Sequence, residues 1–174
     1  MPHHDATLDD FDLRILARHQ HDTQAPARTI ATAVGLSTAA VQRRLKRMRA
    51  AGVIRREVAE VEPAAVGLPI TCVVAIDLER ERQADLERFK RKMQGLAEVQ
   101  QCYYVTGQAD FIAVVVVRSM ADYEAFARRA LLDDDNVKSF VTSIAMERVK
   151  TGVSVAIAAP RAPRPARRRG SRLS

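Results

Sequence analysis

The chain has 174 residues and a mass of 19.3 kDa, enough for one ordinary domain or two small ones and too little for a large multidomain enzyme. With 47% apolar and 28% charged residues, it is expected to fold around a hydrophobic core rather than stay disordered. No apolar run reaches the roughly 18 residues of a membrane span, and the first ten residues do not resemble a signal peptide, so we expect a cytoplasmic protein.

The net charge of +7 is concentrated in two parts of the chain. Residues 1–60 carry +3 and residues 61–159 carry −2, whereas residues 160–174 carry +6, from six arginines without any acidic residue. Residues 37–56 also hold seven cations and no anion. Such a concentrated basic segment is typical of a protein that binds a polyanion, although a solvated helix face is the alternative interpretation.

The first part of the chain shows the pattern of three short helices. Apolar residues recur at helical spacing in two stretches: Leu8, Phe11, Ile15 and Leu16 in the first, and Ile30, Ala31 and Val34 in the second. Gly35 is expected to end the second helix, and Ser37 is a good N-cap for the third. The order helix, loop, short helix, four-residue turn and helix predicts a winged-type helix-turn-helix domain over residues 1–56.

The third helix divides into a buried and an exposed side. At 100° per residue, Val41, Leu45 and Met48 fall on one face and are predicted to pack on the first two helices. Arg44 lies at the edge of this face. We interpret it as a partner for an acidic residue of the first helix, the alternative being a contact with DNA.

The exposed side of this helix is small at its start and cationic further along, which suits a helix that enters the major groove of DNA. Arg43 and Gln42 are predicted to read bases, because arginine suits guanine edges and glutamine suits adenine edges in a bidentate manner. The predicted DNA-binding residues are Ser37, Thr38, Ala39, Gln42, Arg43, Lys46 and Arg47.

Residues 57–70 are predicted to be a linker that no helix or long strand includes, because Pro63, Gly67 and Pro69 interrupt it. Beyond it, the pattern predicts strands over 70–78, 99–106, 111–117 and 137–149 and a helix over 80–94. Ser119 is predicted to cap a second helix whose inner face is Met120, Tyr123, Phe126 and Leu131.

The predicted order β-α-β-β-α-β places the chain in the α+β class. We expect a ferredoxin-like sandwich over residues 71–153, with both helices on one face of a four-stranded antiparallel sheet. Residues 154–174, rich in Arg, Pro and Ala, are predicted to form a disordered basic tail.

Two of the predicted strands, over residues 71–76 and 111–117, are apolar at every position except Thr71. A sheet covered by helices on one face should alternate apolar and polar residues, so the other face must be covered as well. No segment of the chain is left to cover it. The sequence therefore predicts a homodimer, which would also present two recognition helices to one duplex.

The pattern resembles a known family, the Lrp/AsnC transcription regulators, over about residues 7–150. The residues that carry the resemblance are Leu8-Asp9, Asp12, Ile15-Leu16, IATAVGLS at 30–37, Val41, Arg44-Leu45, Arg47, AGVI at 51–54, Val105-Thr106-Gly107 and Asp110-Phe111. The resemblance implies assembly into dimers and higher oligomers, a tetramer or octamer, and a small effector, most often an amino acid, bound between dimers near residue 107. Ala109 in place of an aromatic residue, Pro26-Ala27 at the start of the second helix, and the basic tail depart from the family pattern.

The resemblance also implies an effector site. Its expected residues are Val105, Thr106, Gly107, Gln108 and Asp110 in the turn, with Thr142 and Ser143 on the last strand. Backbone N–H groups around Gly107 suit a carboxylate, and Asp110 suits an ammonium group. The alternative is that Gly107 forms a tight hairpin that Asp110 caps.

We therefore predict a DNA-binding, effector-responsive regulator associated with the nucleoid, with no cofactor and no metal. Cys72 and Cys102 are interpreted as small buried hydrophobes. Two alternatives are an architectural DNA-binding protein of low specificity without an effector, and an enzyme similar to sirohaem decarboxylases. The enzyme is disfavoured because all four histidines precede residue 22. If the tail binds DNA, its deletion should flatten the salt dependence of affinity; a solvated extension is the alternative.

Overall fold

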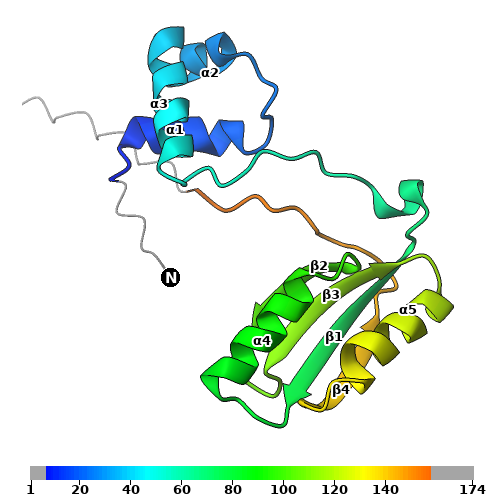
Figure 1. Cartoon of the computed structure of the whole chain (residues 1–174). Coiled ribbons are helices and arrows are strands. Elements are labelled where there is room, and N and C mark those ends of the chain that lie inside the picture. Colours follow the sequence, from blue (N-terminus) through cyan, green and yellow to red (C-terminus); the bar gives the residue numbers. More distant parts are fainter. Residues whose placement is uncertain (1–6, 158–174) are drawn as a thin grey trace, which may run out of the picture. The chain divides into compact units, whose positions relative to one another are not determined.

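The computed structural model describes residues 7–157, so His3, His4 and most of the predicted tail lie outside the described residues. The chain divides into two compact units (Figure 1). One holds residues 7–59 together with 152–157, and the other holds residues 60–151. No helix of the described part is long and apolar enough to cross a membrane.

The first unit contains the three predicted helices. They are α1 (Asp10–His19), α2 (Ala27–Val34) and α3 (Thr38–Ala50). At the start of α1, the carboxylate of Asp9 accepts a hydrogen bond from the backbone N–H of Asp12. The carboxylate of Asp12 in turn accepts one from the backbone N–H of Asp9. Gly35 ends α2 at a φ of 75°, a left-handed conformation that glycine adopts without a Cβ clash, and Ser37 caps α3.

The core of this unit lies where the three helices meet. Its buried members are Ile15, Ile30, Ala31, Val34, Val41, Leu45 and Met48. The stripe of Val41, Leu45 and Met48 predicted from spacing is therefore confirmed as the inner face of α3. Residues 51–69, all of which the structure describes, contain no strand. The helices of the predicted winged-type domain are therefore present, but a β-strand wing does not follow α3.

The second unit is a four-stranded antiparallel sheet with two helices on one face (Figure 1). Its strands are β1 (Ile70–Leu78), β2 (Val99–Tyr104), β3 (Phe111–Val117) and β4 (Val137–Ile144), in the order β2-β3-β1-β4. Its helices are α4 (Gln83–Gln94) and α5 (Met120–Ala127), the latter continued by a π-helical turn, η2 (Arg128–Leu132). This is the predicted ferredoxin-like arrangement.

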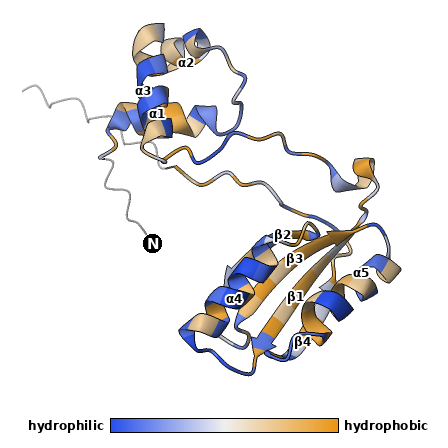
Figure 2. Cartoon of the chain, in the orientation of Figure 1, coloured by the Kyte–Doolittle hydropathy of each residue, from blue (hydrophilic) through white to orange (hydrophobic). Residues whose placement is uncertain are grey.

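Alternate residues of the strands face the two helices. In β1, Cys72, Val74 and Ile76 are fully buried, and they pack with Phe89 of α4 and Phe126 of α5. The two central strands, β1 and β3, are apolar along almost their whole length (Figure 2). The residues between the inward-facing ones therefore give the opposite face of the sheet an apolar surface as well.

The linker differs from the expectation that it contains no helix. A single 3-10 turn, η1 (Pro63–Val66), lies within it. Pro63 stands at its first position, where a missing N–H costs nothing, and Gly67 ends it at a φ of 80°. The same residues that prevent a long helix thus fit one short turn.

Strand β4 is shorter than predicted, because it ends at Ile144 rather than at residue 149. Its last partner in β1 is Cys72, and the N–H of Ala145 then donates to the carbonyl of Thr71. Because β1 begins just after Pro69, the residues that follow Ala145 have no residue of β1 left to pair with.

Met120 was predicted on the inner face of α5, but its side chain is 44% exposed. Tyr123, Phe126 and Leu131 of the same prediction are buried. Met120 is the first residue of the helix, and helical side chains tilt towards the N-terminus. Its side chain therefore projects past the end of the helix instead of onto the sheet.

Candidate nucleic-acid interface and effector turn

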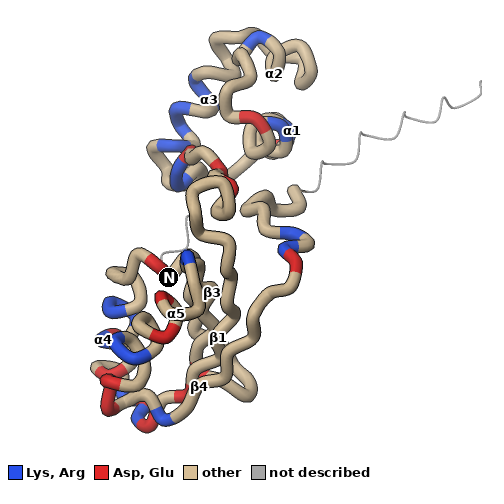
Figure 3. Tube along the Cα trace, turned by 90° about the vertical axis from the view of Figure 1, so that its right-hand side faces the viewer, with Lys and Arg blue, Asp and Glu red and all other residues tan. Residues whose placement is uncertain are grey.

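The exposed side of α3 carries the residues predicted to contact DNA. All seven of them are exposed: Ser37, Thr38, Ala39, Gln42, Arg43, Lys46 and Arg47. Lys and Arg follow one another along this helix (Figure 3). The hydroxyl of Ser37 accepts from the N–H of Ala40 at 3.2 Å, so this side chain also fixes the start of the helix.

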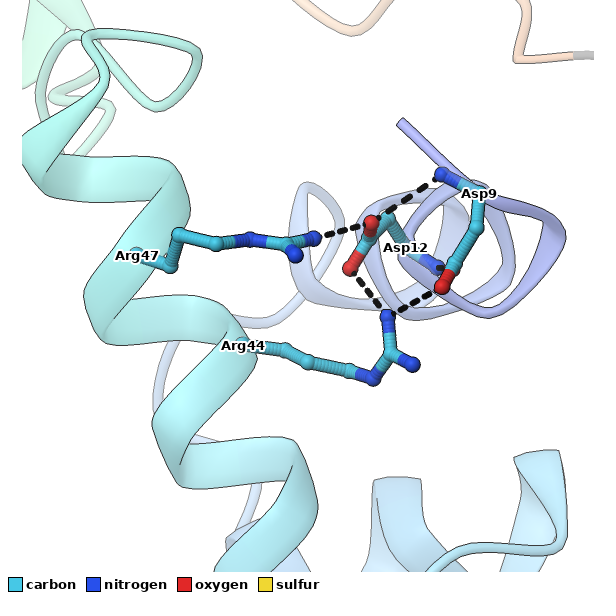
Figure 4. A network of polar contacts seen from close by, with 4 residues as sticks. All are labelled: Asp9, Asp12, Arg44 and Arg47. Carbon is cyan, nitrogen blue, oxygen red and sulfur yellow. Dashed lines mark hydrogen bonds and ion pairs between the residues drawn. The ribbon is translucent and has the colours of Figure 1, made fainter. Parts of the chain in front are cut away.

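Arg44 turns towards α1 and pairs with two carboxylates (Figure 4). Its Nη1 lies 2.7 Å from Oδ2 of Asp9 and 2.8 Å from Oδ1 of Asp12. Asp12 is fully buried, whereas Asp9 is half exposed. The prediction that Arg44 pairs with an acidic residue of the first helix is confirmed.

Arg47 also reaches Asp12, a contact that the sequence analysis did not anticipate (Figure 4). A signal for it exists in the spacing. Arg44 and Arg47 are three residues apart, as are Asp9 and Asp12, so each pair lies on one side of its helix. Arg47 is 54% exposed, so its guanidinium both holds α1 and remains at the surface.

These pairs distinguish the cations of α3 from one another. Arg44 and Arg47 are engaged with α1, and Arg49 is engaged with Glu57 at 2.7 Å. Arg43 and Lys46 form no ion pair with any other residue in 7–157. Among the five cations of α3, these two are therefore the ones that no acidic residue in the described part of the chain neutralises.

A second polar cluster lies at the end of α1. Nε2 of buried His19 is 2.5 Å from Oε1 of Glu57, which also accepts from Arg49. The bond from Arg49, followed by that from His19, lowers the pKa of the Glu57 carboxyl. In the first cluster, the backbone N–H of Asp12 and then the guanidinium of Arg44 lower the pKa of Asp9.

The turn between β2 and β3 holds five of the predicted effector residues, Val105, Thr106, Gly107, Gln108 and Asp110. Gly107 has a φ of 142°, a conformation that residues with a side chain rarely adopt. Oδ2 of Asp110 accepts from the N–H of Leu78 at 2.7 Å, and the N–H of Val105 donates to the carbonyl of Asp110 at 2.9 Å. Asp110 thus caps the hairpin and the end of β1, as the alternative interpretation anticipated.

Within one subunit, Thr142 and Ser143 lie away from this turn. They occupy successive positions of β4 and so point to opposite faces of the sheet. Thr142 pairs with Val74, four residues before Leu78, which is about 13 Å along the strand. Its hydroxyl is hydrogen-bonded to that of Tyr123. The structure therefore brings the turn residues together and leaves the two hydroxyl residues apart from them.

The face of the sheet opposite the helices is apolar and, within the second unit, no helix covers it. Val73, Tyr103 and Val141 on this face are 38%, 54% and 68% exposed. Further half-buried apolar residues of this face are Ala75, Ile112 and Val114. Such a continuous apolar surface is typical of a protein interface.

The described residues contain no group of three or more His, Cys, Asp or Glu side chains placed to hold a metal ion. Both cysteines are free, and burial raises the pKa of each thiol.

Known proteins resemble the chain over most of its length. Residues 8–49 match the model of the AsnC-type helix-turn-helix domain, and residues 71–155 match that of the Lrp/AsnC ligand binding domain. An uncharacterized HTH-type transcriptional regulator of Sinorhizobium fredii is 43% identical over 150 residues, which cover 86% of this chain and 89% of that protein.

Solved structures show the same likeness. An AsnC family transcriptional regulator from Agrobacterium tumefaciens superposes with a TM-score of 0.79 at 32% identity, over 85% of this chain and 96% of that one. A transcriptional regulator of Neisseria meningitidis, in complex with L-Met, has a TM-score of 0.79 at 26% identity, over 86% of this chain and 96% of that one.

Proposed function

The chain belongs to the Lrp/AsnC family of transcriptional regulators, and on this basis we propose that it is a sequence-specific regulator whose dimers associate in response to an amino acid. As a member of that family it is a DNA-binding protein with a ligand-binding domain and not an enzyme. A regulator of chromosomal DNA acts in the cytoplasm at the nucleoid, where we place it.

The assignment of the DNA-binding residues is supported by the different contacts that the cations of α3 make. Arg44 and Arg47 pair with acids of α1, whereas Arg43 and Lys46 are exposed without a described ion pair. Arginine near the start of a recognition helix suits bidentate contact with guanine, and lysine further along suits phosphate. We assign base reading to Arg43 and Gln42 and backbone contact to Lys46, with Ser37 and Thr38.

The substitution Arg43→Ala tests this assignment. It should weaken binding at the preferred operator by about 1–3 kcal/mol and relax selectivity at one base pair, because a bidentate contact is lost. Lys46→Ala should instead weaken all sequences alike and reduce the salt slope by about 1. Fluorescence anisotropy on operator and mutated duplexes measures both, and Arg118→Ala, an exposed arginine of the sheet unit, is the control. Equal loss on every duplex from Arg43→Ala would make Arg43 a phosphate contact.

Two observations support an amino-acid effector at the turn around Gly107. The regulator of Neisseria meningitidis, similar to this chain over most of its length, was solved with L-Met. The turn itself offers backbone groups around a glycine in a special conformation. We propose that Val105, Thr106, Gly107 and Gln108 contact the effector, and that Thr142 and Ser143 contribute only from a neighbouring subunit, since they lie apart from the turn in their own.

The open face of the sheet supports assembly. We propose that two copies pair through Val73, Val114, Val141 and their neighbours, which would bury the apolar surface of both. An effector lodged between such dimers changes DNA affinity only if it binds one state of association better than another. The dimer also supplies two recognition helices for one operator.

One observation favours the second candidate, an architectural DNA-binding protein without an effector. The carboxylate of Asp110 and the hydroxyl of Thr142 already have partners within the chain. An effector that needs these atoms would have to displace those bonds. A ligand screen separates the two functions and is argued in the Discussion.

A further inference from the structure

Arg44 and Arg47 share the carboxylate of Asp12, but they are held to different extents (Figure 4). Arg44 donates to both Asp9 and Asp12, and its Cζ lies 5.6 Å from the centre of the Phe11 ring, a cation–π contact. Only 21% of the Arg44 side chain is exposed. The guanidinium of Arg44 is therefore engaged within the helix-turn-helix unit.

Arg47 keeps most of its capacity to form hydrogen bonds. Within residues 7–157 its one ion pair is the contact with Asp12, which uses Nη2. A guanidinium carries five N–H donors in a rigid plane, and 54% of this side chain is exposed. The guanidinium of Arg47 therefore has donors left for a second anion while it stays bound to Asp12.

The position of Arg47 on α3 indicates where that anion lies. Arg47 comes four residues after Arg43, so it is rotated by about 40° from Arg43, on the side of Arg44. Like charges at this spacing repel each other. Asp12 draws the guanidinium of Arg47 towards α1 and so away from Arg43. Arg47 is thus directed to the flank of the exposed face, which suits a phosphate at the wall of the groove.

Asp12 can order Arg47 without meeting DNA itself. Its side chain has no exposed surface, so its charge is not presented to the phosphates. A free arginine side chain loses rotamer freedom when it binds a phosphate, which lowers the affinity. Because the charge-assisted bond to Asp12 already orders Arg47, much of this loss occurs on folding and not on binding DNA.

We infer that Asp12 is a positioning residue for DNA binding: it holds Arg47 so that the remaining N–H groups of the guanidinium bind a phosphate of the duplex beside the bases read by Arg43. The inference deepens the proposed function and rests on DNA binding by α3. It gives Arg47 a role in affinity and none in sequence preference, because phosphates carry no sequence information.

Arg47→Gln and Arg44→Gln in the full-length protein separate a phosphate contact from a structural one. Each removes one guanidinium from Asp12, so Arg44→Gln is the matched control. Fluorescence anisotropy on operator and unrelated duplexes over about 50–200 mM salt gives affinity and salt slope. Arg47→Gln should flatten the slope of log K against log salt by about 0.9 per subunit and weaken binding to both duplexes alike. Arg44→Gln should leave the slope unchanged.

Asp12→Asn tests the positioning of Arg47. It should weaken DNA binding by about threefold or more in the wild-type chain and by less in the Arg47→Gln chain, because part of its effect passes through Arg47. Chemical denaturation shows whether each variant is folded under the titration conditions.

Arg47→Lys tests the same step with a change at the surface, which should not affect folding. Lysine keeps the charge and lacks the planar fork that contacts Asp12 and a phosphate together. The salt slope should therefore stay as in the wild type, while DNA binding weakens by about threefold.

Four results would overturn the inference. An unchanged salt slope for Arg47→Gln would show that Arg47 meets no phosphate, and an altered base preference would make it a base contact. Tighter DNA binding by Asp12→Asn would show that Asp12 competes with DNA for Arg47. Equal losses from Asp12→Asn with and without Arg47 would show that Asp12 acts only through the fold. Loss of operator selectivity in Arg43→Ala would leave the proposed function of α3 standing in each case.

Discussion

At the scale of single residues, Asp12 determines how the recognition helix is held. Its carboxylate is fully buried and accepts from two arginines of α3, Arg44 and Arg47. A buried carboxylate is stable only when it is paired, and here both partners come from the helix that must be oriented for DNA. The same residue also closes the capping box of α1.

We expect Asp12→Asn to lower the free energy of unfolding of the helix-turn-helix unit by about 2–3 kcal/mol. The amide keeps the shape of the side chain and loses the charge that pairs with both arginines. Chemical denaturation of the full-length protein, followed by circular dichroism, measures the loss. Asp10→Asn is the control, because Asp10 is an exposed acid of the same first turn and should cost less than about 1 kcal/mol. If the two substitutions lower the free energy of unfolding equally, Asp12 would stabilise the fold only through the helix dipole and not through its ion pairs.

Glu98 gives a prediction about pH. The hydrogen bond from Arg129 lowers the pKa of Glu98, and its side chain is 31% exposed. Because the folded pKa lies below the unfolded value, the pair stabilises the fold above the ordinary range near 4.5, and this contribution is lost as the pH falls through the folded pKa. Glu98→Gln should therefore have a lower melting temperature than the wild-type protein at pH 7. In acid, where Glu98 of the wild type is protonated, the two melting temperatures should lie closer together. Glu124→Gln, which removes a more exposed partner of Arg128, should leave the melting curve near wild type at both pH values.

Single residues also show what spacing alone can predict. Arg44 at the margin of a buried stripe was recognised as a partner for α1, because its angular position placed it near that helix. Arg47 falls on the exposed side by the same calculation, yet its long side chain reaches back to Asp12. The angular position of a residue on a helix determines the direction of its Cβ. It does not determine where the guanidinium of a long, flexible arginine side chain ends.

At the scale of elements, patterns of polarity located the α-helices and the strands and missed the short 3-10 turn η1, and the ends of the elements depended on their neighbours. β1 and β3 were predicted with the observed bounds, because turn residues flank both apolar runs. β4 ends five residues before its predicted end, because its length is set by the partner strand β1, whose residue Cys72 pairs with Ile144 although it lies far away in sequence. The roles of Thr142 and Asp110 likewise depend on Tyr123 and Leu78, distant contacts that no local pattern contains.

The open sheet face carries the prediction for assembly. We expect Val73→Asp to raise the dissociation constant of the dimer by about 100-fold or more, because it places an unpaired carboxylate from each copy in an apolar interface. Val73 lies on central strand β1, between Val114 and Ser143 of its neighbours. Sedimentation velocity over a range of protein concentrations gives the constant.

Val66→Asp is the matched control for that experiment. Val66 is 57% exposed but lies in η1, outside the sheet, so the same change there should leave the association unaltered. If both variants sediment like wild type, the open face is not the contact between copies. A wild-type protein that remains a single subunit at high concentration would exclude the dimer altogether.

At the scale of the whole molecule, regulation requires that the effector and the assembly influence one another. Linkage makes the influence reciprocal: an amino acid that favours association must itself bind the associated protein more tightly. One of the common amino acids, added at about 100 times its dissociation constant, should stabilise the protein by about 2.7 kcal/mol and raise its melting temperature. The same amino acid should shift the sedimentation profile, and its affinity should change with protein concentration.

The turn supplies the variant that localises this response. Gly107→Val forces a side chain into a φ of 142°, so it should distort the turn and abolish the shift with the amino acid while the helix-turn-helix unit still binds DNA. Gln108→Ala keeps the turn and should only weaken the response, which separates a loss of contact from a loss of shape. If no common amino acid changes the melting temperature of the wild-type protein, the effector proposal is wrong. The architectural function then becomes the better account, since Asp110 and Thr142 would serve only the fold.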